Sequence, residues 1–277
     1  MVLEQIISTK WLRQRPLYAI ALGLCYTFIA AVTGYLFFKD RFSISLLFLV
    51  TLLLVPSLMN LLSFEEERER SDGIRRFFVN HQSVFEIYLF LSIGVFIGYL
   101  IVIWVLAAVQ VDLSSTVGEQ MKILGGGVTA NEIQNFQVDQ FTHSLNLFSN
   151  NLGVALIFFV LSFFYGAGAI FLMVWNASIF ATFVSLTIEN INKGVAHAFT
   201  LLGAFSIYIL PEIGGFLLAA IAGGVISKAV IVEEFMSESF KNVVKDAFIL
   251  LLMSFAVLLL AAFLEGYVGV NIIRALV

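Results

Sequence analysis

Charge, cysteine and proline are scarce in this chain, and each shortage narrows what the protein can be. Only 12% of the 277 residues are charged, whereas 60% are hydrophobic, and there are one cysteine and three prolines. A soluble domain is typically about 25% charged and about 45–50% apolar. With a mean hydropathy of +0.99, the chain must have lipid rather than water as its main solvent.

Several classes of protein are excluded by what is missing. Cys25 has no second cysteine to pair with, so an internal disulfide is excluded. A net charge of −4 without a stripe of lysine and arginine excludes a nucleic-acid partner, because phosphates must be neutralised. The histidines His81, His143 and His197 are far apart, and no zinc-protease, serine-hydrolase or nucleotide-binding motif occurs. We therefore expect no metal, no cofactor and no enzymatic activity.

Long apolar stretches predict an all-α fold, a polytopic bundle of transmembrane helices with about seven spans. A helical span needs about 20 residues. The expected spans are residues 17–37, 42–63, 84–108, 150–165, 168–188, 197–230 and 246–270. Gly166-Ala-Gly168 offers a break between the fourth and fifth spans. If those two instead form one tilted helix, six spans remain.

Three parts follow one another along the chain. Residues 1–110 form an N-terminal three-span segment with a charged loop at 64–82, residues 111–149 form an external loop, and residues 150–277 form the remaining transmembrane segment. The charged loop is rich in arginine, whereas the external loop contains one lysine, Lys122, and no arginine. By the positive-inside rule, we expect a multi-pass protein of the cell membrane with its N-terminus in the cytoplasm.

Amphipathic and charged helices are expected at the membrane surface. Apolar residues at loosely helical spacing predict a short helix on the outer leaflet, and they are Ile133, Phe136, Phe141, Leu145 and Phe148. Residues 231–245 have a similar pattern and predict an interfacial connecting helix. The charged run 64–70 is either a solvated helical extension of the second span or a docking face for a cytoplasmic partner.

Glu212 is the most informative polar residue, because it lies in the middle of an apolar stretch. A carboxylate at the bilayer centre costs about 3 kcal/mol on insertion scales, so it must be protonated, paired or facing water. Pro211 predicts a broken helix, since its ring clashes with the carbonyl of Ile207. Many transporters build a midplane site at such a break. Glu212 is therefore either a protonated group bonded to a neighbouring helix or part of an ion or solute site.

Two other polar residues interrupt apolar runs. Glu265 lies near the end of the last span, where it is either a second buried acid or a residue of the outer interface. Asn176 follows Trp175, and its amide is expected to bridge two helices or to cap a helix at the membrane edge.

Small residues predict where helices approach closely. After Glu212 they recur at every fourth position, as Gly215, Ala219, Gly223 and Ser227. A second, shorter pattern is Gly94-x-x-x-Gly98 in the third span. Such stripes let two backbones pack without a layer of side chains between them. The longer stripe serves either packing within the chain or the seam of a dimer.

Several of these segments together resemble one known family. They are Asn150-Asn-Leu-Gly-Val-Ala-Leu, Phe164-Tyr-Gly-Ala-Gly-Ala-Ile-Phe-Leu, Trp175-Asn-Ala-Ser178, Pro211-Glu-Ile-Gly-Gly-Phe, Ala222-Gly-Gly-Val-Ile-Ser227 and Ala261-Ala-Phe-Leu-Glu265. Over roughly residues 145–270 the chain is similar to the stage II sporulation protein M family, and looks most like its archaeal branch.

Two adjacent positions depart from the family pattern. The family commonly has His-Gly four and three residues before the glutamate, whereas this chain has Tyr208 and Ile209. A His–Glu pair is therefore missing, although Tyr208 can still hydrogen-bond to Glu212 across one helical turn.

The resemblance implies a non-enzymatic polytopic membrane protein. In sporulating bacteria the family anchors an engulfment complex that contains cell-wall hydrolases. We therefore expect a membrane scaffold or anchor, forming a homodimer in the lipid bilayer and recruiting an unknown membrane or cytoplasmic protein. The alternative is a channel or transporter whose path for an ion or solute passes Glu212.

Overall fold

The computed structural model describes residue 12 and residues 15–72, 77–124, 139–191 and 194–276. Within them the chain is helical and contains no strand. The main helices are α3 (Tyr18–Phe37), α4 (Phe42–Asp72), α5 (Phe77–Ala108), α6 (Leu113–Leu124), α8 (Gln140–Phe164), α9 (Gly166–Ile191), α10 (Val195–Val232) and α11 (Glu238–Phe263). The shorter elements are the 3-10 turn η1 (Lys39–Arg41), the π-helical segment η3 (Leu264–Gly269) and α12 (Val270–Leu276).

The expected polytopic bundle is confirmed. Among the described residues, 7 helices are long and apolar enough to cross a membrane. They cover Tyr18–Phe37, Lys39–Leu58, Gln82–Ala108, Gln140–Phe164, Gly168–Ile191, Ala196–Ile231 and Glu238–Ile272. The protein is therefore a multi-pass membrane protein.

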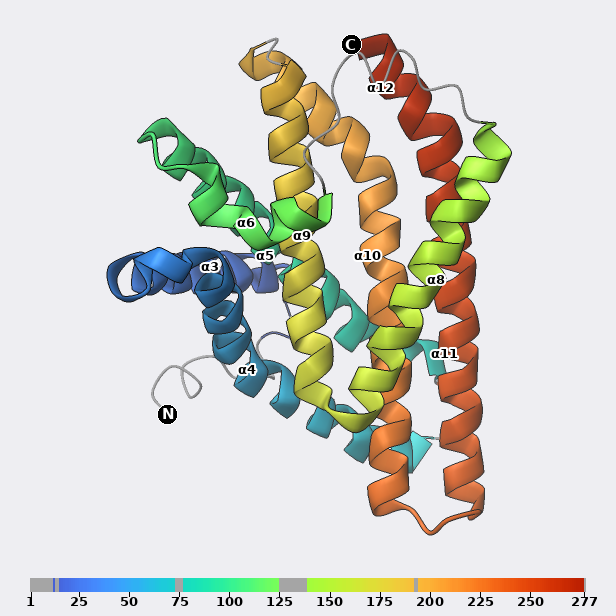
Figure 1. Cartoon of the computed structure of the whole chain (residues 1–277). Coiled ribbons are helices and arrows are strands. Elements are labelled where there is room, and N and C mark those ends of the chain that lie inside the picture. The colour runs from blue at the N-terminus through green and yellow to red at the C-terminus, as the bar shows by residue number, and fades with distance from the viewer. Residues whose placement is uncertain (1–11, 13–14, 73–76, 125–138, 192–193, 277) are drawn as a thin grey trace.

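The helices form two groups that α9 joins. On one side α3, α4 and α5 pack together, and on the other α8, α10 and α11 do so. Between them, α9 contacts α4 and α5 as well as α8 and α10 (Figure 1). One end of the second group carries the turns that join α8 to α9 and α10 to α11, so its helices run antiparallel to their chain neighbours (Figure 1).

The break between the fourth and fifth spans lies where the glycines predicted it. α8 ends at Phe164, and Tyr165 has extended backbone angles of φ −144° and ψ 94°. Its N–H donates to Leu161 O at 2.6 Å, and the Gly168 N–H donates to Tyr165 O at 2.7 Å. These bonds satisfy backbone groups at the turn. Because α8 and α9 are two separate helices, the six-span alternative is excluded.

The break expected at Pro211 is not found. α10 continues for 38 residues from Val195 to Val232 with the proline inside it. A proline in a helix removes one hydrogen bond and favours a kink, and Figure 1 shows α10 as one bent rod without interruption. Helix continuity keeps the other backbone groups hydrogen-bonded, which hydrocarbon requires, and residues 212–225 are all buried among the neighbouring helices.

The surface helices differ from expectation. Phe141, Leu145 and Phe148 lie in the first turns of α8, which is a spanning helix, whereas Ile133 and Phe136 lie outside the described residues. In place of one connecting helix over 231–245, α10 ends at Val232 and α11 begins at Glu238. A period of 3.6 residues is common to an interfacial helix and to the first turns of a span, so the pattern cannot separate them.

Two elements lie outside the apolar spans. The charged segment does extend the second span as a helix, because α4 continues to Asp72. The predicted external loop contains α6, which was not expected and which packs against α4 and α9.

Candidate functional site

A cavity of about 520 Å³ lies among α8, α9 and α10, with the end of α6 and the segment η3 also contributing to its wall. Its polar lining residues are Asn150, Asn151, Asn176, Tyr208, Glu212 and Glu265. Its aromatic lining residues include Trp175, Phe180, Phe183 and Phe216. Four of the five polar site residues expected from the sequence therefore meet at one place. The fifth, Pro211, is the chain neighbour of Glu212 and does not line the cavity.

Three polar residues of the cavity wall lie near the middle of their helices rather than at the ends. Asn151 is near the middle of α8, Asn176 near the middle of α9 and Glu212 near the middle of α10. Each of these helices is long and apolar enough to cross a membrane. Polar groups at this depth are costly unless they have partners or contact water.

Glu212 has both a neighbouring-helix partner and access to the cavity. Glu212 is 8% exposed, and the Asn151 side chain on α8 lies near enough to interact with its carboxyl group. Glu265 is close enough to interact electrostatically with the same carboxyl group. Glu212 thus lies against a neighbouring helix and also lines the cavity.

Glu265 lines the same cavity because of the local shape of its helix. It belongs to the π-helical segment η3, whose wider turn changes the direction of its side chains. The segment packs closely on its neighbours: a methyl group added at Gly266 would collide with the Ser144 hydroxyl on α8, and one added at Gly269 would lie 2.8 Å from the Tyr208 ring. These close contacts fix the position of Glu265 against α8 and α10.

Tyr208 packs on an aromatic ring of its own helix, which in turn packs on a ring of α9. Its ring lies edge-on to Phe205 with centroids 6.2 Å apart, and Phe205 lies edge-on to Phe183 at 5.3 Å. The Tyr208 hydroxyl group interacts electrostatically with Glu265 and with Glu212. Tyr208 and Glu212 thus face one cavity, as their spacing of one helical turn implies.

Asn176 differs from its expected role. Its amide donates to Leu172 O at 2.9 Å, four residues earlier in the same helix. The described hydrogen bond therefore neither bridges two helices nor caps a helix end. The residue still contributes an amide group to the cavity wall from α9.

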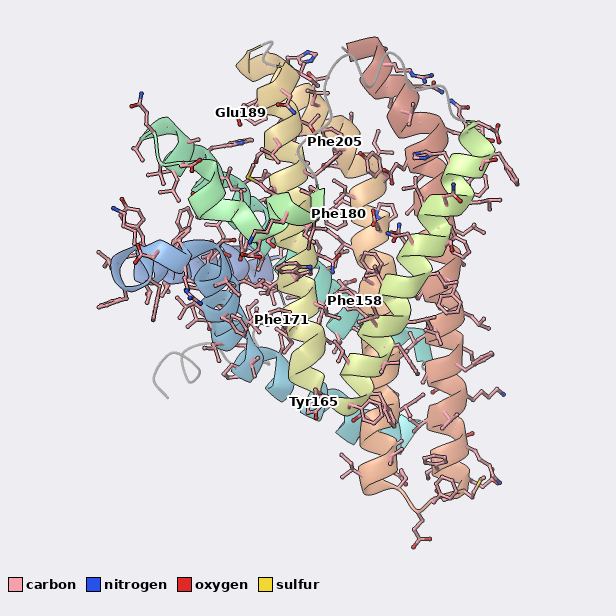
Figure 2. The ribbon with its side chains drawn as sticks, in the orientation of Figure 1. Phe158, Tyr165, Phe171, Phe180, Glu189 and Phe205 are labelled. Atoms are coloured by element: carbon pink, nitrogen blue, oxygen red, sulfur yellow. The ribbon has the colours of Figure 1, made fainter. Side chains whose placement is uncertain are left out.

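The sequence did not identify Asn150, Asn151 or the aromatic wall as part of the site. The two adjacent amides gave little signal, because they follow other polar residues at the beginning of the apolar run. The aromatic side chains gave no signal, since phenylalanine occurs 29 times in this chain. Figure 2 shows Phe158 and Phe180 in the space between α9 and the pair formed by α8 and α10. Phe216 lines the cavity, and its ring stacks on that of Phe158 with centroids 5.4 Å apart.

The small residues expected at helix contacts lie at close backbone approaches. A methyl group added at Gly94 would collide with the Ile20 carbonyl on α3, and one at Gly98 would lie 2.7 Å from Thr27. On α10, a methyl at Gly215 would lie 2.5 Å from Leu258 of α11. The Ser254 hydroxyl donates to Gly215 O at 2.7 Å across the same contact.

The rest of the small-residue stripe also faces neighbours within the chain. A methyl group at Gly223 would collide with the Phe159 carbonyl on α8. Ala219 is fully buried, whereas Ser227 is partly exposed. Most of this face is therefore occupied by α8 and α11, which leaves little of it for a dimer seam.

The chemistry of the lining is acidic and aromatic. Among the described residues of the cavity wall, none is lysine, arginine or histidine. The described part of the chain also contains no group of three or more His, Cys, Asp and Glu side chains that could hold a metal ion. The cavity can therefore offer two carboxyl groups, three amides and one phenol to a bound solute.

Comparison with known proteins identifies the family. A family model described as Stage II sporulation protein M matches residues 86–269, which is more than half of the chain. No curated protein and no solved structure matches the chain. The match includes α8, α9, α10 and Glu265, and it contains every residue of the cavity wall. The chain therefore belongs to the stage II sporulation protein M family.

Proposed function

We propose that this protein is a transporter or channel whose solute path passes the cavity at Glu212. One observation carries the proposal: two acidic side chains and three amides from separate helices line one cavity at the middle of the membrane bundle. Acidic residues inside a membrane protein commonly mark the path of an ion or solute. The central position of the site is a feature that transporters share.

The size of the cavity favours a functional over a purely structural role. A buried carboxyl group that only joined two helices would need one partner, and Asn151 already supplies it. The cavity of about 520 Å³ is instead within the range of about 300–1,000 Å³ that small-molecule sites occupy. Room for many water molecules also lets a carboxyl group exist at this depth.

Flux through purified protein in liposomes tests the proposal. We expect the native protein to carry protons or a co-supplied solute down a gradient, and Glu212→Gln to reduce this flux by about tenfold or more. Glu189→Gln is the matched control, because Glu189 is exposed near the end of α9 and does not line the cavity (Figure 2). Absence of flux in the native protein, or equal flux in both variants, would contradict the proposal.

The second candidate is a membrane scaffold or anchor, which the charged extension of α4 supports. The apolar span ends at Leu58, but the helix continues to Asp72 and carries the charged run 64–70. At 1.5 Å per residue, the extension is about 20 Å long, which is enough for a partner protein to bind.

Crosslinking and affinity capture from membranes test the scaffold and its expected homodimer. We expect a dimer and a co-purifying partner, and loss of the partner when the charges of residues 65–70 are replaced by serine. If the native protein and the serine variant are both recovered as monomers without a partner, this second candidate is contradicted.

A further inference from the structure

We propose that the cavity binds a small organic cation, meaning an ammonium group that carries apolar substituents. This rests on the proposed transport function, since it names the class of solute. Three features of the cavity wall lead to it: the sign of its charges, the placement of its aromatic rings and its volume.

The sign of the charge selects a cation. Glu212 on α10 and Glu265 on η3 are the ionisable carboxyl groups of the wall, and the described lining contains no basic side chain to neutralise them. An anion in this cavity would meet two carboxyl groups, charged or protonated, and no basic side chain that could pair with it. A cation would supply the missing opposite charge, which is the usual way in which buried carboxylates are stabilised.

The aromatic rings select an organic cation over a hydrated inorganic ion. Trp175, Phe180 and Phe183 line the cavity from α9, and Phe216 lines it from α10. Faces of such rings attract ammonium groups, and aromatic cages are a recurrent way to bind alkylated ammonium. The same wall contains aliphatic residues, among them Leu147, Val154, Ile179 and Ile209, which can contact apolar substituents.

The volume and the ligand set argue against a metal ion. Calcium needs about 6–8 oxygen ligands gathered at about 2.3–2.6 Å from one point, whereas the oxygens of this wall are spread around a cavity of about 520 Å³. The described residues contain no group of three or more potential metal-binding side chains. An organic cation fills more of this space and needs fewer charged partners.

Binding of three compounds of similar shape and different charge tests the inference. The purified full-length protein is titrated with tetramethylammonium, neopentyl alcohol and pivalate, and binding is followed by calorimetry and by tryptophan fluorescence, because Trp175 lines the cavity. We expect the cation to bind at least about tenfold more tightly than either of the others. Glu212→Gln and Glu265→Gln should each weaken the binding of the cation by about tenfold, while Glu189→Gln should leave it unchanged.

Each outcome separates this inference from the transport proposal. If the alcohol or pivalate binds more tightly than the cation, and Glu212→Gln loses that binding, the cation assignment is overturned. The transport proposal still stands in that case. Proton flux that depends on Glu212, without binding of tetramethylammonium, also overturns the cation assignment and leaves the transport proposal standing. Absence of both flux and binding overturns both. If Glu212→Gln does not fold, Glu265→Gln carries the charge test, and Glu212→Asp, which keeps the charge, is expected to retain binding within a few-fold.

An ammonium group can come from a free amine or from the headgroup of an aminolipid. The titration is therefore repeated in lipid discs of phosphatidylglycerol, with and without phosphatidylethanolamine. Competition by phosphatidylethanolamine supports the inference and identifies a lipid headgroup as the source. Unchanged binding supports it and identifies a free amine. Loss of tetramethylammonium binding in discs that lack phosphatidylethanolamine overturns it.

Discussion

Asn151 is the polar neighbour of Glu212 on the adjacent helix. It is 6% exposed, and its side chain lies near enough to interact with the Glu212 carboxyl group. Removing one partner of a buried polar pair leaves the other unsatisfied, which costs about 1–3 kcal/mol. The pair thus links the stability of the α8–α10 contact to the polarity of the cavity.

Asn151→Leu should therefore destabilise the protein by about 1–3 kcal/mol, measured by unfolding in detergent. Asn150→Leu is the matched control, because Asn150 is exposed at the same depth of α8. We expect it to change the free energy of unfolding by less than about 0.5 kcal/mol. Equal effects of the two substitutions would show that Asn151 has no special partner.

Asp139 fixes the beginning of α8 outside the membrane core. Its carboxylate accepts the Thr142 N–H at 2.9 Å and the Thr142 hydroxyl at 2.8 Å. The bond from the Thr142 backbone, followed by that from its side chain, lowers the pKa of Asp139 below its ordinary value of 3.8. Because the folded pKa is lowered, this stabilisation is present above the ordinary value and is lost as the pH falls through the lowered pKa.

The comparison with Asp139→Asn reveals this pH dependence, since asparagine caps a helix but does not titrate. The difference in melting temperature between the two proteins should be constant above about pH 5 and should move in favour of Asp139→Asn below about pH 4. A constant difference down to about pH 3 would contradict the capping role.

At the scale of the element, α10 carries two glycines with opposite surroundings. A methyl group at Gly223 would collide with the Phe159 carbonyl, and backbone atoms cannot move aside as side chains do. Gly203 is exposed and has no neighbouring atom within 4 Å of such a methyl group. One helix therefore contains both a packing-critical glycine and a replaceable one.

Gly223→Ala should destabilise the protein by about 1–3 kcal/mol, because α8 and α10 must separate. Gly203→Ala should stabilise it by about 0.5–1 kcal/mol, since alanine favours the helix. Unfolding in detergent measures both. A stabilising effect at Gly223 would show that the two helices do not pack as described.

α6 is held in place by one buried glutamine. Gln120 is 1% exposed. It accepts the Ser43 hydroxyl of α4 at 2.9 Å and donates to the Ser178 hydroxyl of α9 at 3.0 Å. The helix that it anchors contributes Ile123 and Leu124 to the cavity wall. Its attachment therefore determines how well the cavity is closed on this side.

Gln120→Leu should leave two serine hydroxyls without this partner, which costs about 1–3 kcal/mol. Faster hydrogen exchange of the α6 amides should follow. Lys122→Ala is the control, because its ion pair with Glu119 at 2.8 Å is exposed, and such pairs contribute only about 0–1 kcal/mol. Unchanged exchange in Gln120→Leu would contradict the anchoring role.

The elements show what the sequence could predict and what it could not. Apolar length predicted the spans, and glycine at Gly166 and Gly168 predicted the turn, because these signals are local. α6 was missed because its formation depends on partners from α4 and α9, which are distant in sequence. The prediction of a break at Pro211 was wrong, because a buried helix can bend around a proline while keeping its remaining hydrogen bonds.

At the scale of the whole molecule, the cavity is a product of tertiary structure. Glu212 and Glu265 are 53 residues apart in sequence (265 − 212), and they meet because α10 and α11 pack antiparallel along their length. The sequence marked both as unusual acids in apolar surroundings. It could not pair them, since the direction of Glu265 depends on the π-helical segment η3.

Chemical accessibility of the cavity wall tests the central claim most directly. In a Cys25→Ser background, which removes the one native thiol, Asn150→Cys places a thiol at the cavity and Leu156→Cys places one on an exposed, apolar position of the same helix. Both variants are treated in membranes with a cationic and an anionic methanethiosulfonate reagent. The account predicts that Asn150→Cys reacts, faster with the cationic reagent, and that Leu156→Cys does not react. An unreactive Asn150→Cys, or one that prefers the anionic reagent, would contradict an aqueous, cation-selective cavity at the middle of this membrane protein.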